Sequence, residues 1–201
     1  MSVFILCVAW MFQITVASGQ NENLGPELFR RTVPTNDPAE HDLSLAVYGP
    51  NAAQNTLEAA CEQAANESKA VFIKSGHPEC GWCRVFDRYH SSPEVQRILG
   101  KYYIIVAIDI KYMPDGKSIF SQYSQPGSPS WVIISPQKQV IVDSYAPGGN
   151  VGYPGSPEES AYYTAALKKA TPSITEEELH TLSQLVQKPW ITWKKEHQAH
   201  N

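Results

Sequence analysis

Cysteine and net charge are both scarce in this sequence. It contains four cysteines among 201 residues, which is too few for a small scaffold held together by disulfides. Its 16 basic residues do not exceed its 20 acidic residues, so the composition gives no sign of a nucleic-acid-binding surface. The hydrophobic fraction of 42% and the charged fraction of 18% are typical of a globular chain and exclude wholesale disorder.

The first nineteen residues lack charged side chains altogether. The apolar stretch of residues 3–17 has the length of a signal-peptide core and is shorter than the roughly 20 residues of a membrane span. Small residues, Ala17 and Gly19, end the segment as they would before a cleavage site. We predict a signal peptide over residues 1–19 and export to the periplasm or the cell exterior. Because no basic residue precedes the apolar stretch, a membrane anchor over residues 3–17 and a buried element are the alternatives, and membrane contact is expected only with the anchor.

The remaining chain divides by composition into three parts. Residues 20–45 are polar and contain three prolines, which predicts a linker or loosely packed arm. Residues 46–170 carry alternating strand and helix patterns, and residues 171–201 read as a helical extension and tail. The element order predicts an α/β sandwich with a central mixed sheet flanked by helices. Helices are expected at 52–66, 118–123 and 156–170, and strands at 45–48, 69–74, 102–110, 131–134 and 139–145.

Helix ends can be read from capping residues. Residues 51–54, 156–159 and 175–178 each place a capping side chain three residues before a Glu or Gln, the pattern that starts a helix. Pro189 is expected to end the last helix, because proline lacks the backbone N–H that a helix interior uses.

A Cys-x-x-Cys motif, Cys80 to Cys83, lies between a predicted strand and a predicted helix. At that position the first cysteine meets the positive end of the helix dipole, which favours a thiolate and lowers the thiol pKa. The second cysteine lies one turn further on and can resolve a mixed disulfide by intramolecular attack. The pair therefore predicts thiol–disulfide exchange.

Three other interpretations compete with redox chemistry. A structural zinc site usually needs four ligands, whereas here there is one pair, with Cys61 and the histidines scattered along the chain. Covalent haem attachment needs a histidine where Arg84 stands. A structural disulfide is possible, although a loop this small gains little from closure.

The sequence resembles the thioredoxin-like superfamily over residues 46–170. The resemblance rests on a strand, the Cys-x-x-Cys motif, a helix, a long strand and then Gly127-Ser128-Pro129 before a hairpin. Within the superfamily it is most similar to exported or stand-alone thioredoxin-like proteins with a Cys-x-Trp-Cys motif, which here is residues 80–83. The resemblance implies that Pro129 is a cis-proline lying beside the redox pair in space.

The same resemblance implies the roles of individual residues. Cys80 would be the attacking nucleophile and Cys83 the resolving thiol. Ser128 would offer backbone groups to an extended substrate, next to Pro129. Between the cysteines, Gly81 and Trp82 replace the usual Gly-Pro and would tune the redox potential. Trp82 is expected either to dock substrates or to pack under the loop of residues 147–155, and Arg84 to support the thiolate.

One feature departs from the superfamily pattern. Many thioredoxins carry a buried aspartate on the strand before the motif, and here Lys74 stands at about that position. Glu79 is adjacent to Cys80 and is expected to be a solvated loop carboxylate. The missing acid favours an alternative function, a protein-binding or assembly module with a structural or vestigial Cys80–Cys83 pair.

The function predicted from these residues is thiol–disulfide oxidoreductase. The substrates would be protein thiols and disulfides, and a second protein would restore the redox state of the pair. No metal or organic cofactor is expected, because the exchangeable disulfide is itself the redox group.

Overall fold

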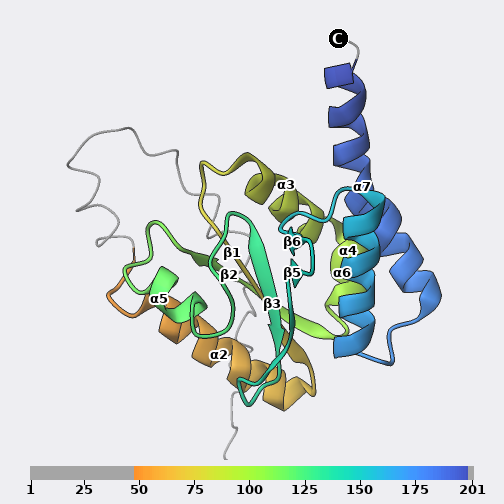
Figure 1. The fold of residues 1–201 in the computed structure, drawn as a ribbon. Helices are drawn as coiled ribbons and strands as arrows, with labels where there is room; N and C mark the ends of the chain where they lie inside the picture. The colour runs from red at the N-terminus through yellow and green to blue at the C-terminus, as the bar shows by residue number, and fades with distance from the viewer. Residues whose placement is uncertain (1–47, 199–201) are drawn as a thin grey trace, which may run out of the picture.

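A four-stranded mixed sheet forms the centre of the protein, which a computed structural model describes over residues 48–198 (Figure 1). The strands are β1 (Ala70–Gly76), β2 (Tyr103–Asp109), β3 (Ser130–Ile134) and β4 (Val140–Asp143). Their order is β2-β1-β3-β4, with β1 parallel to β2 and antiparallel to β3. The mixed sheet predicted from the sequence is confirmed.

Helices cover both faces of the sheet, because side chains along β1 alternate between them. Val71 and Ile73 point into a core shared with α2 (Ala52–Glu67) and α5 (Gly116–Phe120). Phe72 points to the opposite face and into a second, more aromatic core. Four helices cover that second face, as Figure 1 shows: α3 (Gly81–His90), α4 (Pro93–Leu99), α6 (Pro157–Ala170) and α7 (Glu176–Gln198).

A short hairpin follows the sheet along the chain. It consists of β5 (Tyr145–Ala146) and β6 (Gly149–Asn150), which pair only with each other. Residues 151–155 come next and are all buried although they form no helix or strand. This segment lies on the aromatic face of the domain, where Tyr153 stacks on Trp82 next to the Cys-x-x-Cys motif.

Two of the three predicted capping patterns are confirmed. Residues 156–159 form a complete capping box at the start of α6, and residues 175–178 make the same reciprocal bonds before α7. The prediction for Asn51 is wrong, because its side chain makes no capping bond. Instead Asp115 accepts the backbone N–H groups of Ala53 and Gln54, both at 2.9 Å. A carboxylate from the neighbouring segment therefore neutralises the N-terminus of α2.

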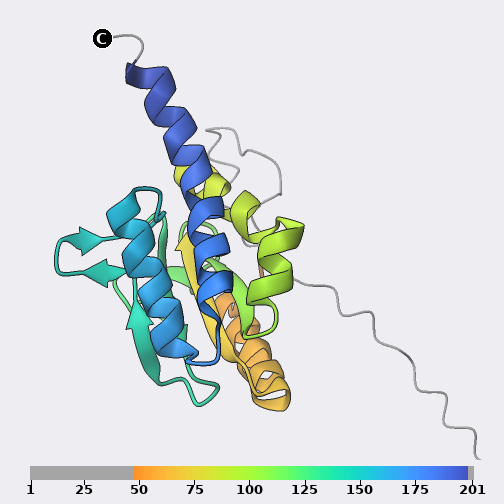
Figure 2. The same ribbon diagram turned by 90° about the vertical axis from the view of Figure 1, so that its right-hand side faces the viewer.

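The prediction that Pro189 ends the last helix is also wrong. Helix α7 contains Pro189 and continues to Gln198 (Figure 2). A proline inside a helix costs about 3 kcal/mol, so contacts beyond it must offset that cost. Trp190 packs closely on Gly155: a Cβ added at Gly155 would lie 2.7 Å from the Trp190 Cβ. Further along the helix, Trp193 contacts Trp82 edge-on.

Helix α7 is part of the aromatic core. Leu182 and Val186 are fully buried, and Leu179 joins the same cluster. The helix packs mainly on α6, α3 and α4. The segment that the sequence presents as an extension therefore shares its buried face with the described part of the thioredoxin-like domain, residues 48–170.

The predicted signal peptide (1–19) and linker (20–45) lie outside the described residues. The same holds for most of the expected strand at 45–48, and Tyr48 is not part of a strand. Among residues 48–198, no helix has both the length and the apolar character needed to cross a membrane.

The shared core gives the first prediction. Leu182→Ala should lower the free energy of unfolding by about 2–5 kcal/mol, because it removes a fully buried side chain and leaves a cavity. Urea unfolding followed by circular dichroism should still show one transition. Ile191→Ala is the matched control on the same helix, since Ile191 is 40% exposed. Equal and small effects of both substitutions would contradict the view that α7 belongs to the folding unit.

Candidate active site

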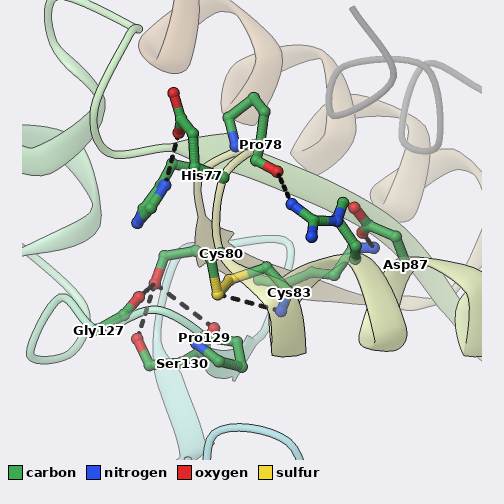
Figure 3. Close-up of a disulfide and its surroundings, with 12 residues drawn as sticks. His77, Pro78, Cys80, Cys83, Asp87, Gly127, Pro129 and Ser130 are labelled. Carbon is green, nitrogen blue, oxygen red and sulfur yellow. Dashed lines mark hydrogen bonds and ion pairs between the residues drawn. A yellow bond between two sulfur atoms is a disulfide. The ribbon is translucent and has the colours of Figure 1, made fainter. Parts of the chain in front are cut away.

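The Cys80–Cys83 pair lies where β1 gives way to α3. Strand β1 ends at Gly76, a turn closes with the Cys80 N–H on the His77 carbonyl, and α3 begins at Gly81. Cys80 is the N-cap residue of α3, and its Sγ accepts the N–H of Cys83 at 3.1 Å. The two cysteines form a disulfide with their Cα atoms 5.2 Å apart (Figure 3).

The two cysteines differ in their access to solvent. Cys80 is partly exposed, whereas Cys83 is only 4% exposed and faces the core side of α3. A thiolate on Cys80 would lie at the N-terminus of α3, where the Cys83 N–H already donates to its sulfur and the helix dipole lowers a thiol pKa. Gly81, between them, is exposed and has open space around its Cα.

The loop before β3 reaches the same end of the sheet. Ser130 pairs with Ser75 near the end of β1, so Pro129 lies beside the strand that leads to Cys80. The Ser75 hydroxyl bonds the Ser130 hydroxyl at 2.7 Å and the Gly127 carbonyl at 2.9 Å. Figure 3 shows this loop next to the disulfide. The Ser128–Pro129 peptide bond is cis.

Ser128 is the exposed member of this loop. Pro129 and Ser130 are buried, whereas Ser128 faces solvent. Within residues 48–198, Ser128 makes no hydrogen bond. Its backbone groups are therefore available to an extended peptide, the arrangement used in recognition by strand addition.

Trp82 is packed between aromatic rings. Its ring stacks on Tyr153 with 5.1 Å between centroids and meets Trp193 edge-on at 5.9 Å. The Tyr153 hydroxyl in turn donates to the Val186 carbonyl of α7. Trp82 thus packs under residues 147–155, one of the two expectations from the sequence, and its partly exposed edge lies beside the Cys-x-x-Cys motif.

Lys74 and Asp87 form an ion pair near the motif. Lys74 was identified from the sequence, but Asp87 was not. Lys74, only 4% exposed, donates to Oδ1 of Asp87 on α3. Burial lowers the pKa of Lys74 and raises the pKa of Asp87. Asp87 follows Cys83 by four residues, so both lie on one face of α3. The four-residue spacing from Cys83 was the signal in the sequence that could have identified Asp87. Asp87 is the acid near the motif that β1 lacks.

Asp87 keeps one oxygen unused. Its Oδ2 is buried and accepts no hydrogen bond from residues 48–198. His90, also buried nearby, bonds the Phe86 carbonyl through Nδ1 at 3.0 Å. Burial, helped by the charge of Lys74, lowers the pKa of His90 well below its usual value. The imidazole is therefore neutral, and Asp87 with Lys74 carries the charge in this pocket of polar groups.

Glu79 accepts hydrogen bonds from three side chains, whereas the sequence suggested a solvated carboxylate. It accepts hydrogen bonds from the Tyr112 hydroxyl, from His77 Nδ1 at 2.8 Å and from Lys111 Nζ at 3.0 Å. Burial works against ionisation, but these donors outweigh it and hold the pKa of Glu79 at about 2. The negative charge beside Cys80 is thus met by positive and polar neighbours.

Arg84 is exposed and donates to the Pro78 carbonyl at 2.8 Å. This hydrogen bond from the guanidinium stabilises the turn that precedes Cys80. Cys61 lies on the other side of the sheet in the core with α2, where burial raises its thiol pKa. Residues 48–198 contain no cluster of three or more side chains suited to hold a metal ion.

Eight solved chains match this sequence, and three of them show how distant the similarity is. A disulphide isomerase from Xylella fastidiosa Temecula1 is 14% identical with a TM-score of 0.44, covering 79% of this chain and 99% of that one. A DsbH oxidoreductase is 20% identical with a TM-score of 0.42, covering 57% and 80%. A thioredoxin-fold protein from Helicobacter pylori is 14% identical with a TM-score of 0.35, covering 59% and 83%.

Comparison with curated proteins finds no significant match. A family model named Thioredox_DsbH, described as a protein of unknown function (DUF255), matches residues 46–199. That match spans the whole sheet, all of the helices described here and the Cys-x-x-Cys motif. The chain therefore belongs to the thioredoxin-like DsbH family, DUF255.

Proposed function

We propose that this protein is a thiol–disulfide oxidoreductase that exchanges disulfides with protein substrates through Cys80 and Cys83. The observation that carries the proposal is the asymmetry of the pair. Cys80 is accessible and caps α3, with its Sγ accepting the Cys83 N–H, whereas Cys83 is buried behind it. A reactive nucleophile needs exposure and a lowered pKa, and a resolving thiol needs proximity more than exposure.

The reaction proceeds in two exchanges. In the reducing direction, the Cys80 thiolate attacks one sulfur of a substrate disulfide, and the other substrate sulfur leaves as a thiolate that takes up a proton. The Cys83 thiol then loses its proton and attacks Cys80 Sγ. The second substrate sulfur leaves, the substrate has gained two electrons and two protons, and the Cys80–Cys83 disulfide has formed. The oxidising direction is the reverse sequence.

Asp87 is the group best placed to take the proton from Cys83. Residues four apart on a helix have Cβ atoms about 5–6 Å apart, and Oδ2 of Asp87 has no competing donor among the described residues. The ion pair with Lys74 keeps the carboxylate ionised in a buried place, where it would otherwise tend to be neutral. A carboxylate supplied by α3 supports an active pair over the vestigial one that the lack of an acid on β1 would favour.

Substrates would bind across the loop beside the disulfide. Ser128 would supply backbone groups, with the cis Pro129 keeping the chain close to the disulfide, and the partly exposed Trp82 would add apolar contact. Protein substrates and a redox partner protein would use the same surface in turn. The reaction needs no metal or organic cofactor, and export to an oxidising compartment would suit disulfide exchange.

Cysteine variants test the proposal directly. Wild-type protein should reduce or oxidise a disulfide-bonded peptide, and Cys80→Ser should abolish the exchange. Cys83→Ser should form a stable mixed disulfide through Cys80, detected by mass spectrometry, because the resolving thiol is gone. Cys61→Ser is the matched control and should behave as wild type, since Cys61 lies in the other core.

The reduction potential in glutathione buffers then assigns the direction. A value near about −270 mV indicates a reductase, and one near about −120 to −180 mV an oxidase or isomerase. A pair that does not exchange at all would refute the enzyme and favour a binding module with a structural disulfide.

The role of Asp87 gives a separate prediction. Asp87→Asn should slow the release of the mixed disulfide by roughly 10²-fold or more, the usual scale of a lost general base. Formation of the mixed disulfide by Cys80 should be unaffected. In wild type the release rate should fall as the pH drops through the raised pKa of Asp87, because the protonated carboxyl accepts no proton. Quenched reactions followed by mass spectrometry separate the two steps.

A double variant controls for folding. Asp87→Asn alone leaves Lys74 charged and buried without this partner, which costs stability. Lys74→Met with Asp87→Asn removes the charge on both sides and should restore stability, measured by thermal unfolding, but not the rate of release. If the double variant releases substrate as fast as wild type, Asp87 is not the proton acceptor.

A further inference from the structure

The β5–β6 hairpin touches the loop that would bind substrate, through a residue that the mechanism above does not use. Asn150, the last residue of β6, donates from Nδ2 to the Pro129 carbonyl at 2.9 Å. This bond spans 21 residues of sequence. It joins the hairpin to the carbonyl of Pro129, the residue that directly follows Ser128.

The orientation of the Asn150 amide is fixed by its other partners. Its Oδ1 accepts the Ser144 hydroxyl at 2.8 Å and the Gly152 N–H at 3.0 Å. Both partners are donors to that oxygen, so Nδ2 is the atom directed at Pro129. The Ser144 hydroxyl also accepts the N–H of Trp131 at 3.2 Å, which ties the arrangement to β3.

The loop of residues 127–129 and the segment that includes Asn150 and Gly152 pack in close contact. A Cβ on Gly152 would collide with the Pro129 carbonyl oxygen, and a Cβ on Gly127 would lie 3.0 Å from Asn150 Nδ2. Glycine at both positions lets the loop and the segment after the hairpin approach each other closely. The loop from Gly127 to Pro129 is thus held at both of its ends, by Asn150 at the Pro129 carbonyl and by Ser75 at the Gly127 carbonyl.

We propose that Asn150 is a positioning residue that holds the Ser128–Pro129 peptide ready to pair with an extended substrate segment. This role rests on the proposed function. Ser128 is exposed and makes no hydrogen bond within the described chain, so its orientation depends on the bonds of its neighbours. A preorganised backbone binds an extended peptide without first paying the entropy of ordering. Asn150 acts through Pro129 and touches neither sulfur in the disulfide pair.

The test compares a peptide disulfide with a small disulfide. Asn150→Asp keeps the size of the side chain and the Oδ1 bonds but turns the donor toward Pro129 into an acceptor. We expect kcat/KM for a disulfide-bonded peptide to fall by roughly tenfold, the scale of one hydrogen bond, mainly through KM. Turnover of hydroxyethyl disulfide, which has no peptide backbone to pair, should be unchanged, as should the reduction potential.

Two further variants keep the result interpretable. Asn66→Asp makes the same chemical change on an exposed residue at the far end of α2 and should leave both activities intact. Asn150→Ala removes all three bonds and should lower peptide turnover at least as much as Asn150→Asp. Thermal unfolding shows whether each variant is folded at the assay temperature.

The outcomes separate the two proposals. If Asn150→Asp leaves peptide turnover unchanged, or lowers the turnover of both disulfides equally, the positioning role is overturned. If wild-type protein exchanges with neither disulfide, the proposed function itself fails, and the role of Asn150 fails with it.

Discussion

The hydrogen bond from the Cys83 N–H to the Sγ of Cys80 depends on how closely α3 follows β1. Only four residues separate Gly76 from Gly81, so the first turn of α3 starts directly above the end of the sheet. Cys80 becomes the N-cap, with its sulfur at the positive end of the helix. The same geometry turns Cys83 inward. One short connection thereby gives the two sulfurs different exposure and different electrostatics.

The polar groups below the motif follow from that placement. A helix that directs Cys83 inward also directs residue 87 inward one turn later, and a carboxylate there needs a partner because burial disfavours its charge. Lys74 provides it from β1. In this protein the lysine lies on the strand and the carboxylate on the helix, whereas the thioredoxin pattern places a carboxylate on the strand.

Local patterns predicted much of this arrangement. The capping box at residues 156–159, the strand character of 131–134 and the position of the Cys-x-x-Cys motif each depend on neighbours in sequence, so the sequence was sufficient. Predictions failed where a distant partner decided the outcome. Asp115 caps α2 across 61 and 62 residues, and the hydrogen bonds of Glu79 come partly from residues that follow β2. Contacts between residues far apart in sequence produce no local periodicity or spacing from which they could be predicted.

The continuation of α7 through Pro189 shows how the distant parts depend on one another. Residues 151–155 contact the Pro129 carbonyl through Gly152, Trp82 through Tyr153, and α7 through Gly155. Each of these contacts needs the segment to follow one path, because a side chain at Gly152 or Gly155 would collide with its neighbour. Trp190 and Trp193 therefore do more than offset the proline. They hold α7 against the segment that also contacts the loop of residues 127–129, so the stability of the C-terminal helix and the geometry beside the disulfide depend on the same packing.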